Sequence, residues 1–193
     1  MKILIACEES QTVCKAFRVK GHEAYSCDIL PCSGGNPEWH IQGDVLNHLE
    51  ENWDMMIAHP PCTDLAVSGA AWFKEKIADG RQMKALRFVR YLLECNISKI
   101  ALENPVSVIS TKIRKPDQII HPWMFGHLEQ KTTCLWLKNL PPLKETKNVK
   151  EEMMKLPKNK RERLHYLSPG ENRSIERSKT FQGIADAMAD QWG

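Results

Sequence analysis

A cysteine on a proline-stiffened loop is the residue of this 193-residue chain whose type and setting most favour chemistry. Cys62 follows Pro60 and Pro61, directly after an apolar run that ends at Ala58. Two prolines fix the backbone, so the thiol can be held at one angle to a substrate without an entropic cost in each turnover. The alternative is a small apolar thiol that fills a gap in the core, which is the commoner fate of a cysteine.

A carboxylate at the end of another apolar run is a candidate proton partner for this thiol. Glu103 follows the run over residues 98–102 and precedes Asn104 and Pro105. If the two runs are neighbouring strands, a nucleophile and a proton partner lie over adjoining strand ends. Alternatively, Glu103 caps a helix that begins near Val106, and Asn104 before Pro105 suits a cap position as well.

Strand and helix patterns alternate along the chain and must position these groups. Buried strands are predicted over residues 2–6, 23–27, 53–58, 98–102 and 132–137, and helices over residues 11–20, after Gly80 and over 180–192. Strands that alternate with helices over the first 105 residues predict βαβ units, and therefore an α/β fold with a doubly wound, mainly parallel sheet. In such sheets the site lies beyond the carboxyl ends of the strands.

That rule selects four places in this sequence. They are the loop after Ala6, Asp28, the loop after Ala58 and the turn after Leu102, and all four carry polar or reactive groups. The sequence therefore predicts a site at the carboxyl edge of the sheet.

The composition is that of a globular protein with one domain. Hydrophobic residues make up 42% and charged residues 26%. The apolar start is too short for a signal peptide or a membrane span, so we expect a cytoplasmic protein without a membrane partner. The 7 cysteines include no Cys-x-x-Cys pair, which favours reduced thiols. Cys27, Cys32 and His40 do not match the spacing of a common zinc site, so no metal is expected.

The positive charge is concentrated in the C-terminal third. The net charge is +3, whereas residues 144–179 hold 11 Lys/Arg against 6 Asp/Glu, a local charge of +5. A surface that faces phosphates would have this composition, and a solvated lysine-rich loop explains it equally well.

At its reactive residues the chain resembles the cytosine-5 DNA methyltransferase family, and more closely its short, often phage-encoded versions. Pro60–Cys62 matches the family's Pro-Pro-Cys nucleophile motif, Ser68 and Gly69 fall where the family has a serine and a glycine, and Glu103–Pro105 resembles its Glu-Asn-Val motif. The resemblance runs from residue 2 to about residue 140 and resumes near residue 173.

The resemblance implies a Rossmann-like fold of the S-adenosylmethionine-dependent type and a covalent mechanism. The Cys62 thiolate would add to C6 of cytosine while Glu103 polarises N3 and the exocyclic amine. A neighbouring cation, His59 or Lys131, would lower the pKa of the thiol. The residues expected to contact the substrate are Pro61, Ser68, Asn104, Gln130 and Thr132.

The resemblance also implies S-adenosyl-L-methionine as cofactor, with Asp28 on its ribose and Asp44 near its adenine amino group. Residues 183–189 resemble the family's closing helix, which packs beside the cofactor. The expected cofactor contacts are Ala6, Cys7, Glu8, Asp28, Ile29, Asp44, Val45, Pro60 and Ala185. Alternatively, Asp28 is a turn residue before Pro31, and Asp44 caps a helical turn that begins at Val45.

The chain departs from the family pattern in three places. Residues 7–12 replace the glycine-rich cofactor loop, Thr132 and Cys134 stand where the family has arginines, and the target-recognition domain shrinks to a basic insert over residues 144–172. Three interpretations follow: a methyltransferase that acts on DNA with low specificity, a nucleotide-binding accessory or counter-defence protein without turnover, and an enzyme that acts on free nucleotides. The sequence carries no signal for an oligomeric state.

Overall fold

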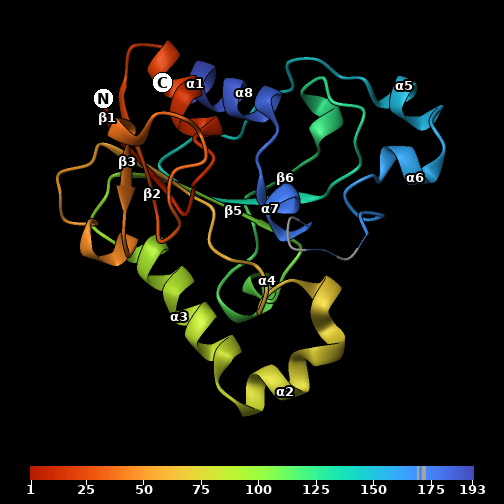
Figure 1. Ribbon diagram of the computed structural model, residues 1–193, viewed down its shortest axis with the longest axis horizontal. Helices are drawn as coiled ribbons and strands as arrows, with labels where there is room; N and C mark the ends of the chain where they lie inside the picture. Colours follow the sequence, from red (N-terminus) through yellow and green to blue (C-terminus); the bar gives the residue numbers. More distant parts are fainter. Residues whose placement is uncertain (169, 171–172) are drawn as a thin grey trace.

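The computed structural model describes residues 1–168, 170 and 173–193 and contains a seven-stranded sheet (Figure 1). The strands are β1 (Lys2–Ala6), β2 (Glu23–Asp28), β3 (His40–Gln42), β4 (Met55–Ala58), β5 (Lys99–Pro105), β6 (Gln118–Ile120) and β7 (Thr133–Lys138). Their order is β3-β2-β1-β4-β5-β7-β6. The first five are joined in parallel, and β7 runs antiparallel to both of its neighbours. The order reverses at β1, which confirms the predicted doubly wound, mainly parallel sheet of Rossmann-like type.

Helices cover both faces of this sheet, as Figure 1 shows. On one face, β1 presents Ile3 and Ile5 to α1 (Thr12–Val19) and α8 (Gln182–Trp192). On the other, β1 presents Leu4 and Ala6 toward α3 (Arg81–Glu94) and α4 (Ile109–Lys112). Because strand side chains alternate, a strand buried on both faces reads as a continuous apolar run, which explains why the buried runs were recognisable in the sequence.

Short helices complete the chain outside these layers. The 3₁₀ helices are η1 (Pro37–Trp39), η2 (Val45–Asn47), η3 (Val67–Trp72) and η4 (Pro122–Met124), and η3 leads into α2 (Phe73–Ala78). The C-terminal third holds α5 (Lys150–Met154), α6 (Lys158–Arg161) and α7 (Arg173–Ser178). No helix among the described residues has the length and apolar character needed to span a membrane.

One predicted strand extends further than the sequence indicated. β5 continues past Leu102 to Pro105 because its last residues pair with the antiparallel β7, with Glu103 opposite Leu135. The next helix begins only at Ile109. The alternative in which Glu103 caps a helix near Val106 is therefore wrong.

The basic segment over residues 144–172 is docked against the body of the molecule. Its described part contains two short helices and buries Met153 and Leu164. The Leu164 backbone N–H donates to Glu129 Oε1 at 3.1 Å, and the Gln130 N–H donates to the Arg161 carbonyl at 2.6 Å. Residues 169, 171 and 172 of this segment lie outside the described residues.

Candidate functional site

The register of the parallel strands aligns the residues that follow them at one edge of the sheet. Ala6 is the partner of both Cys27 and Ala58, and Ala58 is the partner of Leu102. The residues one position further on therefore form the next row, which consists of Asp28, Cys7, His59 and Glu103. All four places selected from the sequence thus adjoin one another.

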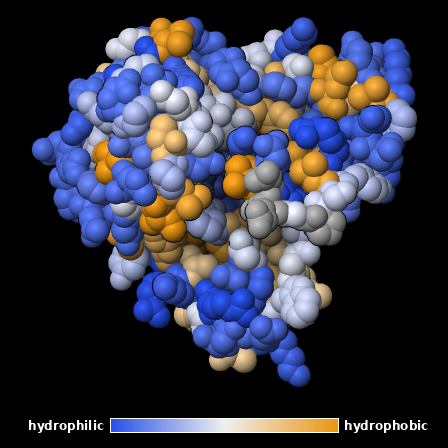
Figure 2. All heavy atoms as spheres, in the orientation of Figure 1, coloured by the Kyte–Doolittle hydropathy of each residue, from blue (hydrophilic) through white to orange (hydrophobic). Residues whose placement is uncertain are grey.

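A cavity of about 1000 Å³ opens at this edge between the strand ends and α3. Figure 2 shows the surface hollowed near its centre, above the lobe that α2 and α3 form. The walls come from the ends of β1, β2 and β3, from the loop after β4 and from one side of α3. Six residues predicted for the site line this cavity: Cys7, Asp28, Ile29, Asp44, Val45 and Pro61.

The two acids in the cavity wall each use one oxygen for local structure. Asp28 Oδ1 accepts the Leu30 N–H at 2.8 Å, and Asp44 Oδ1 accepts the Leu46 N–H at 3.0 Å as the cap of η2. Asp28 therefore does act as a turn residue, and Asp44 does cap the helical turn that begins at Val45. Among the described residues, neither Oδ2 atom has a hydrogen-bond partner, so each acid keeps one oxygen available to a ligand. The Gly43 N–H, which donates to the Asp28 carbonyl at 2.8 Å, ties the two turns together.

The loop after β1 supports a helix as well as the cavity. Glu8 is buried, and its Oε1 and Oε2 accept the N–H groups of Val13 and Cys14 at 2.7 and 3.2 Å, at the start of α1. Burial raises the pKa of this carboxyl group, against the opposing effects of His59 and of these two N–H groups. Glu8 therefore caps α1 and does not line the cavity.

The same loop adopts left-handed backbone conformations without glycine. Cys7 and Gln11 each have φ of 60°, a region that glycine enters at the lowest cost. The Gln11 side chain is buried and bonds both backbone groups of Asn36, with Nε2 donating at 2.8 Å and Oε1 accepting at 3.1 Å. A side chain at Gly34 would collide with Gln11 at 2.5 Å, so this glycine permits the close packing of the two loops.

Three further predicted cofactor contacts lie in the interior and do not line the cavity. Ala6 packs in the core on the α3 face, and Ala185 packs on the opposite face. Pro60 is buried, and its carbonyl accepts a hydrogen bond from Asn104 Nδ2 at 2.9 Å.

A histidine–carboxylate pair bridges the ends of β4 and β5. His59 Nδ1 lies 3.2 Å from Glu103 Oε2, and the two side chains are only 8% and 13% exposed. Burial acts to raise the pKa of Glu103, but the hydrogen bond from His59 and the charges of Lys131 and His59 hold it below its ordinary value. Glu103 is therefore ionised at neutral pH and accepts the hydrogen bond from His59.

Cys62 lies beside this pair, between two residues of the cavity wall. Its neighbours Pro61 and Thr63 line the cavity, and its carbonyl accepts the N–H groups of Leu65 and Ala66 at 3.0 and 2.8 Å. Burial and the charge of Glu103 raise the pKa of the thiol, whereas Lys131 and Arg177 lower it. Lys131 thus acts in the expected direction without lowering the pKa overall, and His59 pairs with Glu103 instead.

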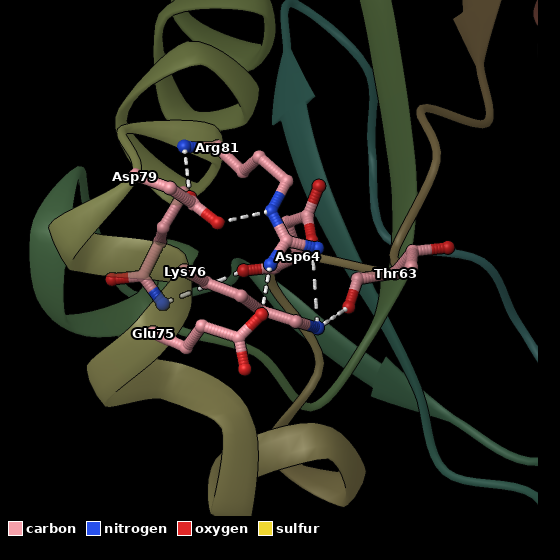
Figure 3. A network of polar contacts seen from close by, with 7 residues as sticks. Thr63, Asp64, Glu75, Lys76, Asp79 and Arg81 are labelled. Carbon is pink, nitrogen blue, oxygen red and sulfur yellow. Dashed lines mark hydrogen bonds and ion pairs between the residues drawn. The ribbon is translucent and has the colours of Figure 1, made fainter.

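A buried lysine anchors the segment that follows Cys62 (Figure 3). Lys76, on α2, is 7% exposed; its Nζ donates to the Thr63 carbonyl and lies 3.4 Å from Asp64 Oδ1. The Asp64 carbonyl in turn accepts a hydrogen bond from Gln82 Nε2 at 3.4 Å. These contacts fix Thr63 and Asp64, and therefore the cavity wall, to α2 and α3.

The residues predicted for the substrate are dispersed. Asn104 is buried, and its Oδ1 has no partner among the described residues. Ser68 is exposed on η3, and Gln130 Nε2 lies 3.4 Å from His121 Nδ1. Thr132 is half-buried beside Lys131, which lines a void of about 10 Å³ together with Glu103.

Two cavity residues were not singled out from the sequence. Lys84 and Arg87, both on α3, line the cavity, and neither forms an ion pair with a described residue. Arg81 lines the same side but is engaged by Asp79 and Glu75 at 2.6 and 2.8 Å. The spacing of three between these cations, which keeps them near one side of a helix, was the available signal.

Comparisons with known proteins add a distant structural likeness. No protein-family model matches the chain, and a search of curated proteins finds no match. Among solved structures, the chain resembles a candidate DNA modification methyltransferase encoded within an E. coli prophage, with 14% identity and a TM-score of 0.46. The alignment covers 71% of this chain and 46% of that one, so this chain corresponds to less than half of that protein's length.

Proposed function

We propose that this protein is an S-adenosylmethionine-dependent methyltransferase that methylates C5 of cytosine in DNA through a covalent adduct with Cys62. The observation that supports this most is the convergence of three groups at one sheet edge. A thiol, a carboxylate on the adjoining strand and a cavity lie there, and two acids in the cavity wall each keep one carboxylate oxygen available to a ligand. These are the groups that nucleophilic attack, proton handling and cofactor binding need.

The cavity residues fit the cofactor that the family resemblance implies. Asp28 Oδ2 would accept from a ribose hydroxyl, and Asp44 Oδ2 from the adenine amino group, because both oxygens are otherwise unused among the described residues. Ile29 and Val45 supply apolar contact for the adenine, and Lys84 or Arg87 a cation for the cofactor's carboxylate. When bound, the cofactor supplies an activated methyl group.

The chain's own groups would prepare the base. The Cys62 thiolate forms a bond to C6, and the displaced electron density makes C5 nucleophilic while N3 takes a proton from Glu103, whose resting carboxylate is ionised and must first acquire that proton. After methylation, the C5 proton passes to solvent water, expulsion of the thiolate restores the aromatic ring, and N3 returns its proton to Glu103. In duplex DNA the cytosine must first leave the stack.

The proposed partner is DNA, bound with low specificity. Lys131 and Arg177 act electrostatically on Cys62, and the segment over residues 144–179 has a charge of +5. Cations around a nucleophile favour the approach of a phosphate backbone. The docked basic segment is too short to form a separate core that reads a major groove.

The decisive experiment uses DNA that contains 5-fluorocytosine, whose C5 position cannot lose a proton. With S-adenosylmethionine present, we expect a covalent adduct on the Cys62 peptide by mass spectrometry. Cys62→Ala should give no adduct, whereas Cys32→Ala, which changes a thiol in the loop after β2, should trap DNA like the parent. An adduct that persists in Cys62→Ala would exclude Cys62 as the nucleophile.

A nucleotide-binding protein without turnover is the second candidate. It is favoured by the raised pKa of Cys62 and by Thr132 and the buried Cys134, which stand where the family has arginines. Calorimetric binding of S-adenosylmethionine without methyl transfer to DNA would support this candidate. Transfer to free cytidine nucleotides, with none to DNA, would indicate the enzyme on small substrates instead.

A further inference from the structure

His59, immediately before the prolines of the nucleophile loop, is held as rigidly as the loop itself. Its backbone N–H donates to the Ala6 carbonyl at 2.9 Å, and Pro60, as the next residue, restricts the backbone conformation of His59 itself. Its side chain is 8% exposed and directs Nδ1 at Glu103 Oε2, 3.2 Å away. An ionised carboxylate can only accept, so Nδ1 carries the proton of this bond.

The other ring nitrogen of His59, Nε2, is not engaged in a hydrogen bond with any described residue. This nitrogen is also buried. Glu8 is close enough for His59 to lower its pKa, but the Glu8 oxygens already accept two backbone N–H groups of α1. His59 is therefore hydrogen-bonded to one of two neighbouring buried carboxylates, and its far ring nitrogen bonds to none of the described residues.

We propose that His59 is a positioning residue for Glu103, which fixes Oε2 so that Oε1 faces the base, and that it stores the proton that Glu103 passes to N3. The inference rests on the function proposed above. The step starts from doubly protonated His59: as the Cys62 thiolate bonds to C6, the Nδ1 proton moves to the Glu103 carboxylate, His59 becomes a neutral imidazole that keeps its proton on Nε2, and Glu103 gives a proton to N3. When the thiolate leaves, N3 returns the proton and the histidinium–carboxylate pair is restored.

The charged groups around the pair are compatible with this role. Lys131 and His59 favour the ionised form of Glu103, while Cys62 and Cys134 are near enough to Glu103 for its charge to raise their pKa values. The titratable and charged groups around the pair are Glu8 in the loop after β1, Cys62 in the nucleophile loop, Lys131 just before β7 and Cys134 in β7. Arg177, on α7, acts on Cys62.

The test compares two replacements of His59 with one control. Asparagine can place its side-chain N–H near the position of Nδ1 but does not titrate, whereas leucine removes the donor. His48→Leu, which disrupts a separate, more exposed histidine–glutamate pair with Glu51, is the control. We expect His59→Leu to slow methyl transfer about 100-fold or more, as loss of a positioned proton donor does, with S-adenosylmethionine affinity unchanged.

The asparagine variant separates positioning from proton storage. His59→Asn should recover most of the activity at its optimum. As the pH is raised, however, its rate should start to fall at a lower pH than that of the parent, because Glu103 must then hold the proton alone. An unchanged pH profile in His59→Asn would overturn the proton store. His59→Leu activity within about threefold of the parent would overturn the positioning role, since a positioned proton donor contributes about 100-fold or more.

A measurement without turnover distinguishes this inference from the proposed function. With ¹³C-labelled glutamate, the Glu103 carboxyl group should titrate at higher pH in His59→Leu than in the parent, and His48→Leu should leave it unchanged. The same Glu103 titration in both proteins would overturn the pair. Absence of methyl transfer in the parent would overturn the proposed function, and with it the catalytic role, even if the titration shows the pair to be intact.

Discussion

The two halves of the sheet's carboxyl edge hold their carboxylates in opposite ways. Asp28 at the end of β2 and Asp44 after β3 stand in the wall of an open cavity, and each accepts one backbone N–H with one oxygen. Glu8 and Glu103, after β1 and in β5, are shielded, and their oxygens meet helix N–H groups or His59. A shielded carboxylate must be matched by internal donors, whereas a solvated one keeps an oxygen for a ligand. Acids at equivalent strand ends can therefore serve different purposes.

The largest effect should come from the thiol between these two halves. Cys62→Ser should abolish methyl transfer, because a hydroxyl group is a poor nucleophile without a dedicated base. Transfer of labelled methyl groups to DNA measures the loss, and S-adenosylmethionine affinity should stay near that of the parent because the side chain does not line the cavity. Cys95→Ser, at the far end of α3, is the matched control. Activity retained in Cys62→Ser would remove Cys62 from the mechanism.

The open half should lose ligand affinity when its acid is removed. Asp28→Ala should weaken S-adenosylmethionine binding by roughly 1.5–3 kcal/mol, or about 10- to 150-fold, as expected for hydrogen bonds to a charged group. Asp54→Ala provides the control, since Asp54 also accepts a backbone N–H, from Lys2 at 2.7 Å, but at the opposite edge of the sheet. Calorimetry that gives equal affinities for parent and Asp28→Ala would remove the cofactor role of this acid.

The buried half should respond through the ionisation of Cys62. Its raised pKa predicts that alkylation by iodoacetamide keeps accelerating with pH beyond the range of an ordinary thiol, about 8.5. Glu103→Gln removes a negative charge and should speed alkylation at fixed pH, whereas Lys131→Met removes a positive charge and should slow it, by up to about tenfold for each pKa unit.

Assignment of the modified peptide by mass spectrometry keeps the readout on one thiol. Cys7 should not compete, because burial and the charge of Asp28 raise its pKa further. Changes of the same sign in both variants would contradict the electrostatic account of the Cys62 site.

The smallest effect should be on stability. Asp44→Ala removes the cap of η2 and should lower the free energy of unfolding by about 1 kcal/mol. Thermal melting measures this cost, and Asp44→Asn, which retains a capping oxygen, should recover most of it. If Asp44→Asn is as unstable as Asp44→Ala, the cap is not the source of the loss.

The sheet was more predictable than the site it carries. The strands over residues 2–6 and 55–58 follow from apolar runs that end at polar residues, and the strand over residues 23–28 follows from a short run between Gly21 and Asp28. β6 has only three residues, and α2 is a short, largely exposed helix, so neither carries a periodic pattern long enough to be recognised. The continuation of β5 through Glu103 depends on pairing with β7, some thirty residues later, which no local pattern encodes.

Within the site, the sequence by itself determined the residue types at each strand end: Cys62 behind two prolines, an acid at the end of β2 and a carboxylate in β5. Only the tertiary structure decided which of these groups face a cavity and which are shielded. It brought His59 to Glu103 across 44 residues, turned Glu8 inward to cap α1, and added Lys84 and Arg87 of α3 to the cavity wall. The physical reason is that burial and hydrogen-bond partners are set by the packing of elements distant in sequence, whereas local spacing fixes only where each strand ends.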